Sequence, residues 1–587
     1  KSQRSGAVVE PMISTQWFLS MGKMAEDALG VVARGETVIL PNEWTKTYEH
    51  FLTNIQDWCV SRQLWWGHQI PAWHGPNGEI VVAREKPADL GDDWVQDPDV
   101  LDTWFSSALW PFSTQGWPSE TFAYKKFYPA TDLETGYDIL FFWVARMIMF
   151  GVHFTGETPF KRVLLHGLIV DETGDKMSKV KGNVIDPLDL IYGATFAEMV
   201  AKTLPGAPEG EALAKFKKAY PSAGTMGNGF PAFGTDALRF TLATFPPSNE
   251  RIALAPKRLE GYRNFLNKIW NATRLVLDSV GPDFAAPSAR PEPQAFMNRW
   301  ILSRLAQAIE IVHAGIENFR TDEATNEFYR FFWTDFCDWY LELTKPVLRD
   351  GGDGKPENEG LRLETRQTLV HVLEASLRLL HPVSPYITEE LWQRVPHRSS
   401  AVSIALAPWP AADVEGKRDL ALEKEMALLQ SVISAARTVR SEHEIKPSSF
   451  VALHLRTDNV AAHALLESQI GSIAFLARTE GQPDLAGTAT PRPAGTSGTV
   501  VAADGGSIEV AVDLKGHVTK EKELARIERE IAKASKEIAT IDKTLAAKGF
   551  LDRAPKEVVD EKNAQRAAFI EAQGRLEAAK KLAEELV

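Results

Sequence analysis

The sequence is poor in cysteine, and this scarcity excludes two kinds of small scaffold. Cys59 and Cys337 are the only cysteines among its 587 residues. Two cysteines cannot build a disulfide framework or a four-cysteine zinc site, so we expect no structural zinc. Common nucleotide and metalloprotease signatures are missing as well, because the chain has no G-x-x-x-x-G-K-[ST], no G-x-G-x-x-G and no H-E-x-x-H.

Long apolar runs and an excess of positive charge are also lacking. The most apolar stretch, Ile139 to Val152, is interrupted by Arg146, and we predict that it is too short and too charged to span a bilayer. We expect no secretory signal, no membrane contact and a cytoplasmic location. The 65 Lys and Arg stand against 78 Asp and Glu, a net charge of −13 that argues against unspecific coating of nucleic acid but permits a local basic surface.

What is present predicts several domains of different texture. Residues 44–193 have an α/β texture, with a buried strand at 162–170 and a long helix at 138–152. Residues 203–234 are rich in Gly and Pro, which predicts an irregular insertion. From Asp236 the pattern is helical, with apolar residues at steps of three and four in 258–277, 298–318, 325–344 and 361–380. Residues 480–507 are rich in small residues and predict a linker or loose loop.

The C-terminal residues show a strict apolar spacing of three and four. The seam consists of Leu524, Ile527, Ile531, Ala534, Ile538, Ile541 and Leu545. It is typical of a coiled coil. Gly549 breaks the helix and Pro555 begins a second one, which predicts an antiparallel hairpin with its tip at 550–554. A solvated coiled coil or a dimerisation arm would explain this pattern as well as a binding role would.

A cluster of lysines follows the strand predicted at 162–170. Lys176, Lys179 and Lys181 lie between glycines, at the carboxyl end of a strand, which is where α/β folds bind ligands. Lysine ammonium groups there could neutralise charge on a departing phosphate. A basic surface turn is the alternative for the charge cluster taken alone.

The tetrapeptide within this cluster carries a resemblance to a known family. Lys176-Met177-Ser178-Lys179 resembles the second signature of class I aminoacyl-tRNA synthetases, in a context typical of the valine-specific members. Blocks at 57–73, 99–110, 135–147, 234–241, 261–271 and 382–392 are similar to the same enzymes. The isoleucine-specific members usually end in a cysteine-rich zinc module, whereas this chain has no cysteine after Cys337.

The resemblance implies roles for individual residues. Catalysis would rest on Lys176, Met177, Ser178 and Lys179, with Val180 standing where the family loop normally has serine. The ATP-binding residues would be Lys179, Gly136, Asp138, His166 and Gly167. The amino-acid pocket would be walled by Trp66, Ile139 and Trp143. Core packing is the alternative for each tryptophan, and an N-cap of the following helix is the alternative for Asp138.

The resemblance also implies a fold and partners. The fold would be multidomain α/β plus α, with the second half of a Rossmann-like catalytic domain, a helical-bundle anticodon-binding domain and a coiled-coil hairpin. We expect the following domains: 1–45, a return segment from an editing insertion; 46–200, the half-domain with a connective insertion; 201–235, the irregular insertion; 236–425, anticodon binding; 426–512, a mixed junction domain with a linker; and 513–587, a tRNA-binding arm. The partners would be tRNA(Val), valine and ATP with Mg²⁺, and we expect a monomer.

One family signature is missing. His-x-Gly-His does not occur anywhere in the sequence. We therefore expect the sequence to be the C-terminal part of a valine-specific ligase, without the first half of its nucleotide-binding sheet and most of its editing domain. Such a part would be inactive alone. The alternative is a non-catalytic tRNA-binding protein derived from such an enzyme.

Overall fold

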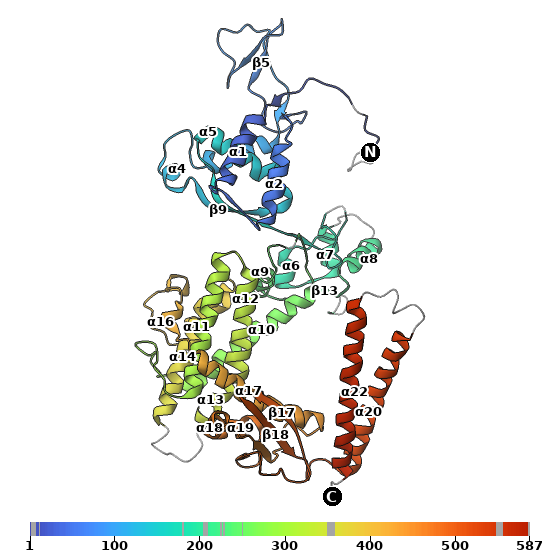
Figure 1. The fold of residues 1–587 in the computed structure, drawn as a ribbon. Helices are drawn as coiled ribbons and strands as arrows, with labels where there is room; N and C mark the ends of the chain where they lie inside the picture. Colours follow the sequence, from blue (N-terminus) through green and yellow to red (C-terminus); the bar gives the residue numbers. More distant parts are fainter. Residues whose placement is uncertain are drawn as a thin grey trace. The chain divides into compact units, whose positions relative to one another are not determined.

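The fold is described from a computed structural model that divides into two compact units (Figure 1). The structure describes residues 1, 7–10, 12–178, 181–203, 209–222, 226, 229–248, 250–348, 359–546 and 556–584. Unit 1 comprises 1–266 and 312–326, and unit 2 comprises 267–311 and 327–587. The boundaries fall inside three helices, α10 (Pro256–Val280), α11 (Phe296–Glu317) and α12 (Thr321–Arg330).

The centre of unit 1 is a parallel sheet of three strands in the order β2 (Val38–Leu40), β10 (Phe160–His166) and β9 (Ala130–Gly136). Parallel strands need apolar cover on both faces. Here that cover comes from α1 (Gly22–Ala33), α2 (Glu43–Thr53), α3 (Thr103–Ser113) and α5 (Ala145–Thr155), whose apolar side chains form one core with the strands. The cyan α5 lies beside α1 in Figure 1.

The helix predicted at 138–152 has three different geometries. It begins as a 3-10 turn (Tyr137–Ile139), continues as a π-helix (Leu140–Val144) and ends as α5 at Gly156, which adopts a left-handed conformation with φ 80°. π-helical turns inside helices are frequent at functional sites. The strand predicted at 162–170 is likewise interrupted, because β11 (Leu168–Val170) leaves the sheet after Gly167 and pairs with β14 (Arg251–Ala253).

The prediction that the apolar stretch is too short and too charged to span a bilayer is wrong. Among the described residues, the helical stretch Tyr137–Thr155 is long and apolar enough to cross a membrane, and so is a bent pair, α18 (Val460–Ser468) with α19 (Ile470–Ala477). The first stretch contributes Leu140, Val144 and Met147 to the core of unit 1, each fully buried. Its apolar character is therefore explained by packing against α1 and α3.

The remaining elements of unit 1 are short. They are the strands β1 (Phe18–Leu19), β3 (Trp58–Cys59), β4 (Ser61–Arg62), β5 (Ala72–His74), β6 (Ile80–Val82), β7 (Val95–Gln96), β8 (Val100–Leu101), β12 (Ala194–Thr195) and β13 (Gly229–Phe230), and the helices α4 (Phe122–Phe127), α6 (Pro187–Tyr192), α7 (Phe196–Thr203), α8 (Glu209–Ala219) and α9 (Thr235–Ala243). Helix α8 lies within 201–235, so the region predicted to be irregular is partly helical. Its Phe216 is fully buried and packs edge-on against Phe196, and this contact fixes the helix despite the flanking Gly and Pro.

Unit 2 is mainly helical, as the periodicity from Asp236 predicts. Its helices continue through a π-helix (Phe331–Tyr340), α13 (Leu341–Leu348), α14 (Glu359–Leu380), α15 (Pro385–Trp392), α16 (Ala412–Glu415) and α17 (Leu420–Glu442). Arg378 on α14 is buried between the carboxylates of Glu374 and Glu415, at 2.7 and 2.8 Å. Because both carboxylates share one guanidinium, the buried charges are paired and hydrogen-bonded.

The prediction of a loose linker at 480–507 is wrong. These residues contribute to a four-stranded sheet in the order β16 (Asp484–Ala486), β15 (Leu453–Arg456), β18 (Gly506–Asp513) and β17 (Thr496–Ala503). β17 and β18 form a hairpin over eight residue pairs. The small residues are required by close packing, since a side chain at Gly498 would meet the backbone of Val510 at 2.7 Å.

The chain's last described elements are two long helices, α20 (Lys520–Leu545) and α22 (Lys556–Glu584). Ion pairs join Asp542 to Arg566 at 2.5 Å and Glu528 to Lys580 at 2.8 Å, so the two helices run in opposite directions. The seven seam residues of α20 are all buried or half-buried. The predicted hairpin tip lies outside the described residues.

Candidate active site

The carboxyl ends of β9 and β10 bring three of the sequence-predicted residues together. Gly136 is the register partner of His166 across the two strands. Nδ1 of His166 lies 2.9 Å from the carbonyl oxygen of Gly167, and its Nε2 lies 3.1 Å from a carboxylate oxygen of Glu134. The imidazole is thereby held in one orientation at this edge of the sheet. Glu134 was not predicted from the sequence, because it lies one residue before the block 135–147.

Gly136 lies where a side chain would crowd this edge. A Cβ atom there would lie 2.9 Å from Oδ1 of Asp138 and 3.4 Å from the side chain of Leu168. Glycine therefore leaves the backbone open to close approach by a ligand and leaves the Asp138 carboxylate undisplaced.

Asp138 does not have the capping role that its position suggests. It lies inside the 3-10 turn, where the cap residue is Gly136 and no side chain caps the helix. Its Oδ2 instead faces the ammonium group of Lys176 at 3.7 Å. The Lys176 side chain is 68% exposed, so this attraction is weak and solvent-screened, and the lysine is free to exchange Asp138 for an anionic ligand.

The lysine loop is built on two residues to which the sequence analysis gave no role. Asp171 follows β11, is 2% exposed and accepts hydrogen bonds from the amides of Thr173 and Asp175. Asn183 donates to Asp171 at 2.8 Å and accepts from the amide of Ser178 at 2.9 Å. The two ends of the loop are thus tied together. An Asp placed directly after a buried strand and before Thr and Gly is a turn signal that could have identified Asp171.

Hydrogen bonding keeps Asp171 charged despite its burial. Burial raises the pKa of Asp171, but the donors on Asn183, Asp175 and Thr173 outweigh it and hold the pKa below its usual range. A charged carboxylate at the base of the loop keeps all of its acceptor sites available. The loop main chain is fixed further by a bridge between Val170 and Lys176.

The loop lysines have different partners. Lys176 faces Asp138, whereas Lys181 pairs with Asp175 at 3.4 Å inside the loop itself. Met177 and Ser178 are half-buried, and the Ser178 hydroxyl accepts from the amide of Lys181. Lys179 and Val180 lie outside the described residues.

The residues predicted to wall an amino-acid pocket lie in different surroundings. Ile139 and Trp143 are half-buried at the start of the helical stretch, and the Trp143 indole donates to the carbonyl of Ser107 at 3.1 Å. The Trp143 ring also packs edge-on against the ring of Trp110, with 6.4 Å between the ring centroids. Trp66, in contrast, is 92% exposed. The structure therefore places Ile139 and Trp143 on one element and leaves Trp66 in solvent.

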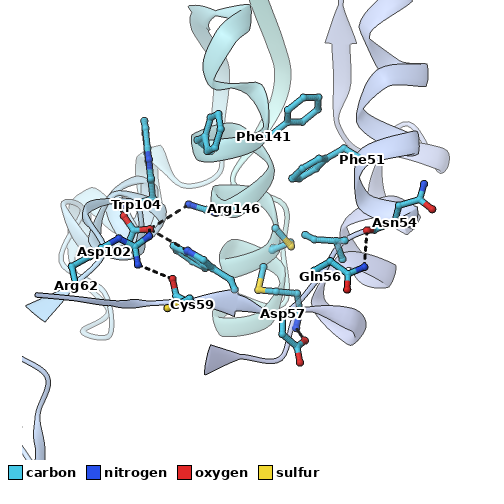
Figure 2. A pocket seen from close by; sticks show the side chains of 15 residues that line it. Phe51, Asn54, Gln56, Asp57, Cys59, Arg62, Asp102, Trp104, Phe141 and Arg146 are labelled. Atoms are coloured by element: carbon cyan, nitrogen blue, oxygen red, sulfur yellow. Dashed lines mark hydrogen bonds and ion pairs between the residues drawn. The ribbon is translucent and has the colours of Figure 1, made fainter. Parts of the chain in front are cut away.

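A pocket of about 630 Å³ lies on unit 1 between α2, β3 and α5 (Figure 2). Figure 2 shows Arg146 of α5 and Arg62 of β4 meeting Asp102, with Trp104 beside them and the stacked rings of Phe51 and Phe141 at the opposite wall. Asp102 also caps α3 by accepting from the amide of Trp104. The block 99–110 contains both Asp102 and Trp104, but their spacing gives no sign of a pocket.

The charges in this pocket are unevenly satisfied. Arg62 and the Trp58 indole donate to one oxygen of Asp102 at 2.6 and 3.1 Å. The guanidinium of Arg146 lies 3.6 Å above the Trp58 ring and 4.0 Å from Asp102. Its buried Nη1 has no hydrogen-bond partner among the described residues. Burial lowers the pKa of Arg146 to about 10. An acceptor entering the pocket would satisfy this nitrogen.

Other features bear on ligands of a different kind. The described residues contain no group of three or more His, Cys, Asp or Glu side chains that could hold a metal ion. On α20, Lys533, Lys536 and Lys543 are exposed and recur at helical spacing on one face. Such a row of ammonium groups suits a polyanion.

Comparison with known proteins gives matches along most of the chain. A family model of class I tRNA synthetases (I, L, M and V) matches residues 5–93 and 77–254. A model of the anticodon-binding domain of tRNA ligase matches 298–455, and one of the valyl tRNA synthetase tRNA binding arm matches 520–583. A solved structure, Mycobacterium tuberculosis methionyl-tRNA synthetase in complex with methionyl-adenylate, is 16% identical, with a TM-score of 0.48 and coverage of 70% of each chain.

Two curated relatives are similar over almost the whole chain. The valine–tRNA ligase of Chromobacterium violaceum is 42% identical over 584 residues, which cover 96% of this chain and 60% of the relative. That of Legionella pneumophila (strain Paris) is 40% identical over 580 residues, covering 95% and 60%. The chain thus spans about 60% of the length of these relatives. It belongs to the class I aminoacyl-tRNA synthetases, and the relatives that it matches within them are valine–tRNA ligases.

Proposed function

We propose that the chain carries the lysine-loop half of the catalytic domain and the tRNA-binding regions of a valine–tRNA ligase. That enzyme would use ATP to convert valine to valyl-adenylate and would then transfer the valyl group to tRNA(Val). The observation that carries the proposal is the position of Lys176 of the Lys-Met-Ser-Lys loop, 3.7 Å from Asp138 at the carboxyl ends of β9 and β10. Support comes from the relatives, which are valine–tRNA ligases over nearly the entire chain.

Adenylate formation would use the edge of the sheet described above. Gly136 and Gly167 would let the nucleotide approach the backbone, Asp138 would accept the ribose hydroxyl groups, and His166 would contact the adenine region. The ammonium groups of Lys176 and Lys179 would stabilise the negative charge that builds up on the departing pyrophosphate, while Met177 and Ser178 hold the loop in shape. Mg²⁺ would enter with ATP and neutralise phosphate charge.

The amino acid would lie beside Ile139 and Trp143, with Trp66 closing the pocket. Apolar walls suit a branched aliphatic side chain but discriminate weakly, because one methylene contributes only about 1–3 kcal/mol. The exposure of Trp66 means that its indole would be covered only when a ligand or another segment lies against it. The pairing of Trp66 with Trp143 therefore stays a proposal.

The tRNA would be held by unit 2. Helices within 236–425 would receive the anticodon arm, which agrees with the family model that matches 298–455. The coiled-coil hairpin of 513–587 would contact the outer corner of the tRNA through exposed lysines such as Lys533 and Lys536. Along the chain, the half of the catalytic domain would come first, followed by the anticodon-binding helices, the junction domain and the tRNA-binding arm.

The test is to measure charging and binding separately. We expect this chain to bind valine tRNA in a filter assay without charging it, because the sequence lacks His-x-Gly-His. Joined to the part of the Chromobacterium violaceum relative that it does not match, the chain should charge valine tRNA. Lys179→Ala in that joined enzyme should lower valine-dependent ATP–pyrophosphate exchange by orders of magnitude. Unchanged exchange would refute the role of the loop.

The absence of His-x-Gly-His from the sequence favours a second candidate function. Without the two histidines, the chain would serve only as a tRNA-binding protein. The joined enzyme separates the two functions: if it binds valine tRNA as tightly as the chain alone but never charges it, the lysine loop is not catalytic and the binding role stands.

A further inference from the structure

A cationic pocket in unit 2 has no role in the function proposed so far. Its volume is about 600 Å³, and it lies where α17 and α19 end, beside the turn that follows α17. The lining residues are Arg437, Arg440, Ser441, Glu444, Ile445, Lys446, Pro447, Leu476 and Arg478. Four of these nine side chains are cationic and only one is a carboxylate.

The single carboxylate does not neutralise the pocket. Glu444 lies 3.7 Å from Arg529 of α20, outside the set of lining residues. Within the described part of the chain, none of the four lining cations forms an ion pair. The lining therefore carries an excess of positive charge, opposed from outside the lining by the attraction of Glu342 for Arg437.

Arg440 provides the floor of the pocket. The residue is 6% exposed, and among the described residues its guanidinium donates only to backbone carbonyls, including those of Ala477 and, at 2.7 Å, Ser449. Burial lowers the pKa of Arg440, and the nearby charges of Arg478 and Arg437 lower it further. The carbonyls at the carboxyl ends of the two helices are the negative ends of the helix dipoles, so they stabilise the buried guanidinium. Attraction of an anion to this pocket would therefore come from the exposed cations of the rim.

The rim of the pocket is formed by exposed cations in fixed positions. Arg437 donates twice to the carbonyl of Leu476, at 3.1 and 3.0 Å, which places its guanidinium at the mouth. Glu444 and Arg478 both adopt the left-handed backbone region, with φ of 55° and 53°. Both residues lie at the carboxyl ends of α19 and α17, where this conformation commonly ends a helix, so it sets the direction in which the chain leaves the pocket. Lys446 completes the rim and is exposed.

An aromatic side chain lies next to these cations in the sequence. Phe450 is 58% exposed, although it follows directly after Ser449, whose carbonyl is bound by Arg440. Exposed aromatic rings beside clustered cations are a feature of surfaces that bind nucleic acid, because bases stack on the ring while phosphates meet the charges.

The position of the pocket along the chain points to the same ligand. Residues 437–447 fall within the match to an anticodon-binding domain, and the ion pair from Glu444 to Arg529 joins the pocket edge to the helix matched by a tRNA binding arm. We propose that this pocket binds a phosphodiester group of the tRNA backbone, between the part held by the helices and the part held by α20. This inference rests on the proposed function.

The experiment is the salt dependence of tRNA binding by the full chain. The logarithm of affinity falls linearly with the logarithm of salt concentration, and each phosphate contact contributes about one unit of slope. Because the pocket would neutralise a single phosphate, the double variant of Arg478→Gln with Lys446→Gln should lower the slope by about 1, and each single variant should lower it by no more than that. Both side chains are exposed, so the substitutions leave the core intact.

Arg492→Gln is the matched control. Arg492 lies in the same region of the chain and pairs with Glu509 at 3.1 Å, but it does not line the pocket. Its loss changes the net charge equally and should leave the slope unaltered. If the wild-type chain binds valine tRNA but Arg478→Gln, Lys446→Gln and their double variant all keep the wild-type slope, the inference is wrong while the proposed function stands. If wild-type chain does not bind the tRNA, both are wrong.

A second measurement distinguishes a backbone phosphate from a free anion. Ethylation of individual phosphates of valine tRNA should identify at least one whose modification weakens binding to the wild-type chain but not to the Arg478→Gln variant. Inorganic phosphate is the competing ligand. A rise in thermal stability with inorganic phosphate that is lost in Arg478→Gln, together with no phosphate selected by ethylation, would assign the pocket to a small anion and overturn the proposal.

Discussion

At the scale of single residues, the hydrogen bond between Asp171 and Asn183 determines the shape of the lysine loop. Asp171 accepts through Oδ2, and the same Asn183 side chain accepts from the amide of Ser178. Exchange of the carboxylate for an amide would place an N–H group opposite either the Asn183 N–H group or the backbone N–H groups of Thr173 and Asp175, which donate to Oδ1. The amide of Asn183 cannot turn over to restore the bond without losing Ser178.

We therefore expect Asp171→Asn to destabilise unit 1 by about 1–3 kcal/mol, the cost of leaving a buried polar group unsatisfied. Urea unfolding followed by tryptophan fluorescence measures the loss. The double change Asp171→Asn with Asn183→Asp again places one donor opposite one acceptor between the side chains at positions 171 and 183. It should recover most of the stability. Equal losses in the single and double variants would contradict this account of the loop.

Lys176 and Lys181 offer a comparison within a single loop. Lys176 faces Asp138 at the edge of the sheet, whereas Lys181 pairs with Asp175 within the loop. In the enzyme joined to the part taken from the relative, Lys176→Ala should lower ATP–pyrophosphate exchange at least tenfold, since a positioned charge at a departing phosphate contributes more than about 1.4 kcal/mol. Lys181→Ala makes the same charge change and should have a much smaller effect. Similar losses in both variants would mean that the loop acts only through its summed charge.

At the scale of elements, periodic apolar residues were predictable and small residues were not. The seven seam residues of α20 are buried or half-buried because a spacing of three and four places them on one helix face. β17 was missed, since Gly498 and its neighbours give no alternation and pack closely against Val510. β18 does alternate, with Ile508, Val510 and Val512 buried, and only its first residues lie in the stretch of small residues. Long-range packing of this kind cannot be inferred from local composition.

The first turn of α20 is anchored by a buried charge cluster. Glu523 is 2% exposed and lies 2.9 Å from His443 and 2.5 Å from Arg526. Burial raises the pKa of Glu523, but the hydrogen bonds from His443 and Arg526 outweigh it and lower the pKa to about 2. Since this folded-state pKa lies below the unfolded value of about 4.3, the stabilisation is complete above about pH 4.3 and is lost as the pH falls towards 2.

Glu523→Gln should remove this pH dependence. The difference of about two pKa units corresponds to roughly 3 kcal/mol, which the wild-type anchor should lose between about pH 5 and pH 2. Hydrogen exchange of the α20 amides, compared between wild type and variant at each pH, measures it. Glu521→Gln, an exposed neighbour in the same turn, serves as the control. If the difference in the protection of the α20 amides between wild type and Glu523→Gln does not become smaller in acid, the anchoring role is contradicted.

At the scale of the whole molecule, the candidate site was only partly accessible from the sequence. The sequence identified Lys176 in the lysine loop and Gly136 and Asp138 in the block 135–147. The fold brings these residues together at the carboxyl ends of β9 and β10. These motifs gave no sign of a role for Glu134 or Arg146. Their roles depend on which strands become neighbours and on which atoms are buried, and neither is encoded in residue spacing. Trp66 shows the converse, because a conspicuous residue can lie in solvent.

The hairpin of α20 and α22 is the part for which sequence periodicity alone allows two functions, tRNA binding or dimerisation. Exposed Lys533, Lys536 and Lys543 on one face of α20 favour the first. Their joint substitution by Gln preserves the seam and should lower the slope of the salt dependence of valine tRNA binding by about 3. Deletion of 515–587 should lower it at least as much. Sedimentation supplies the opposing outcome: if the deletion halves the mass of the particle while the slope for tRNA stays constant, the hairpin is a dimerisation arm and its lysines are only a solvated face.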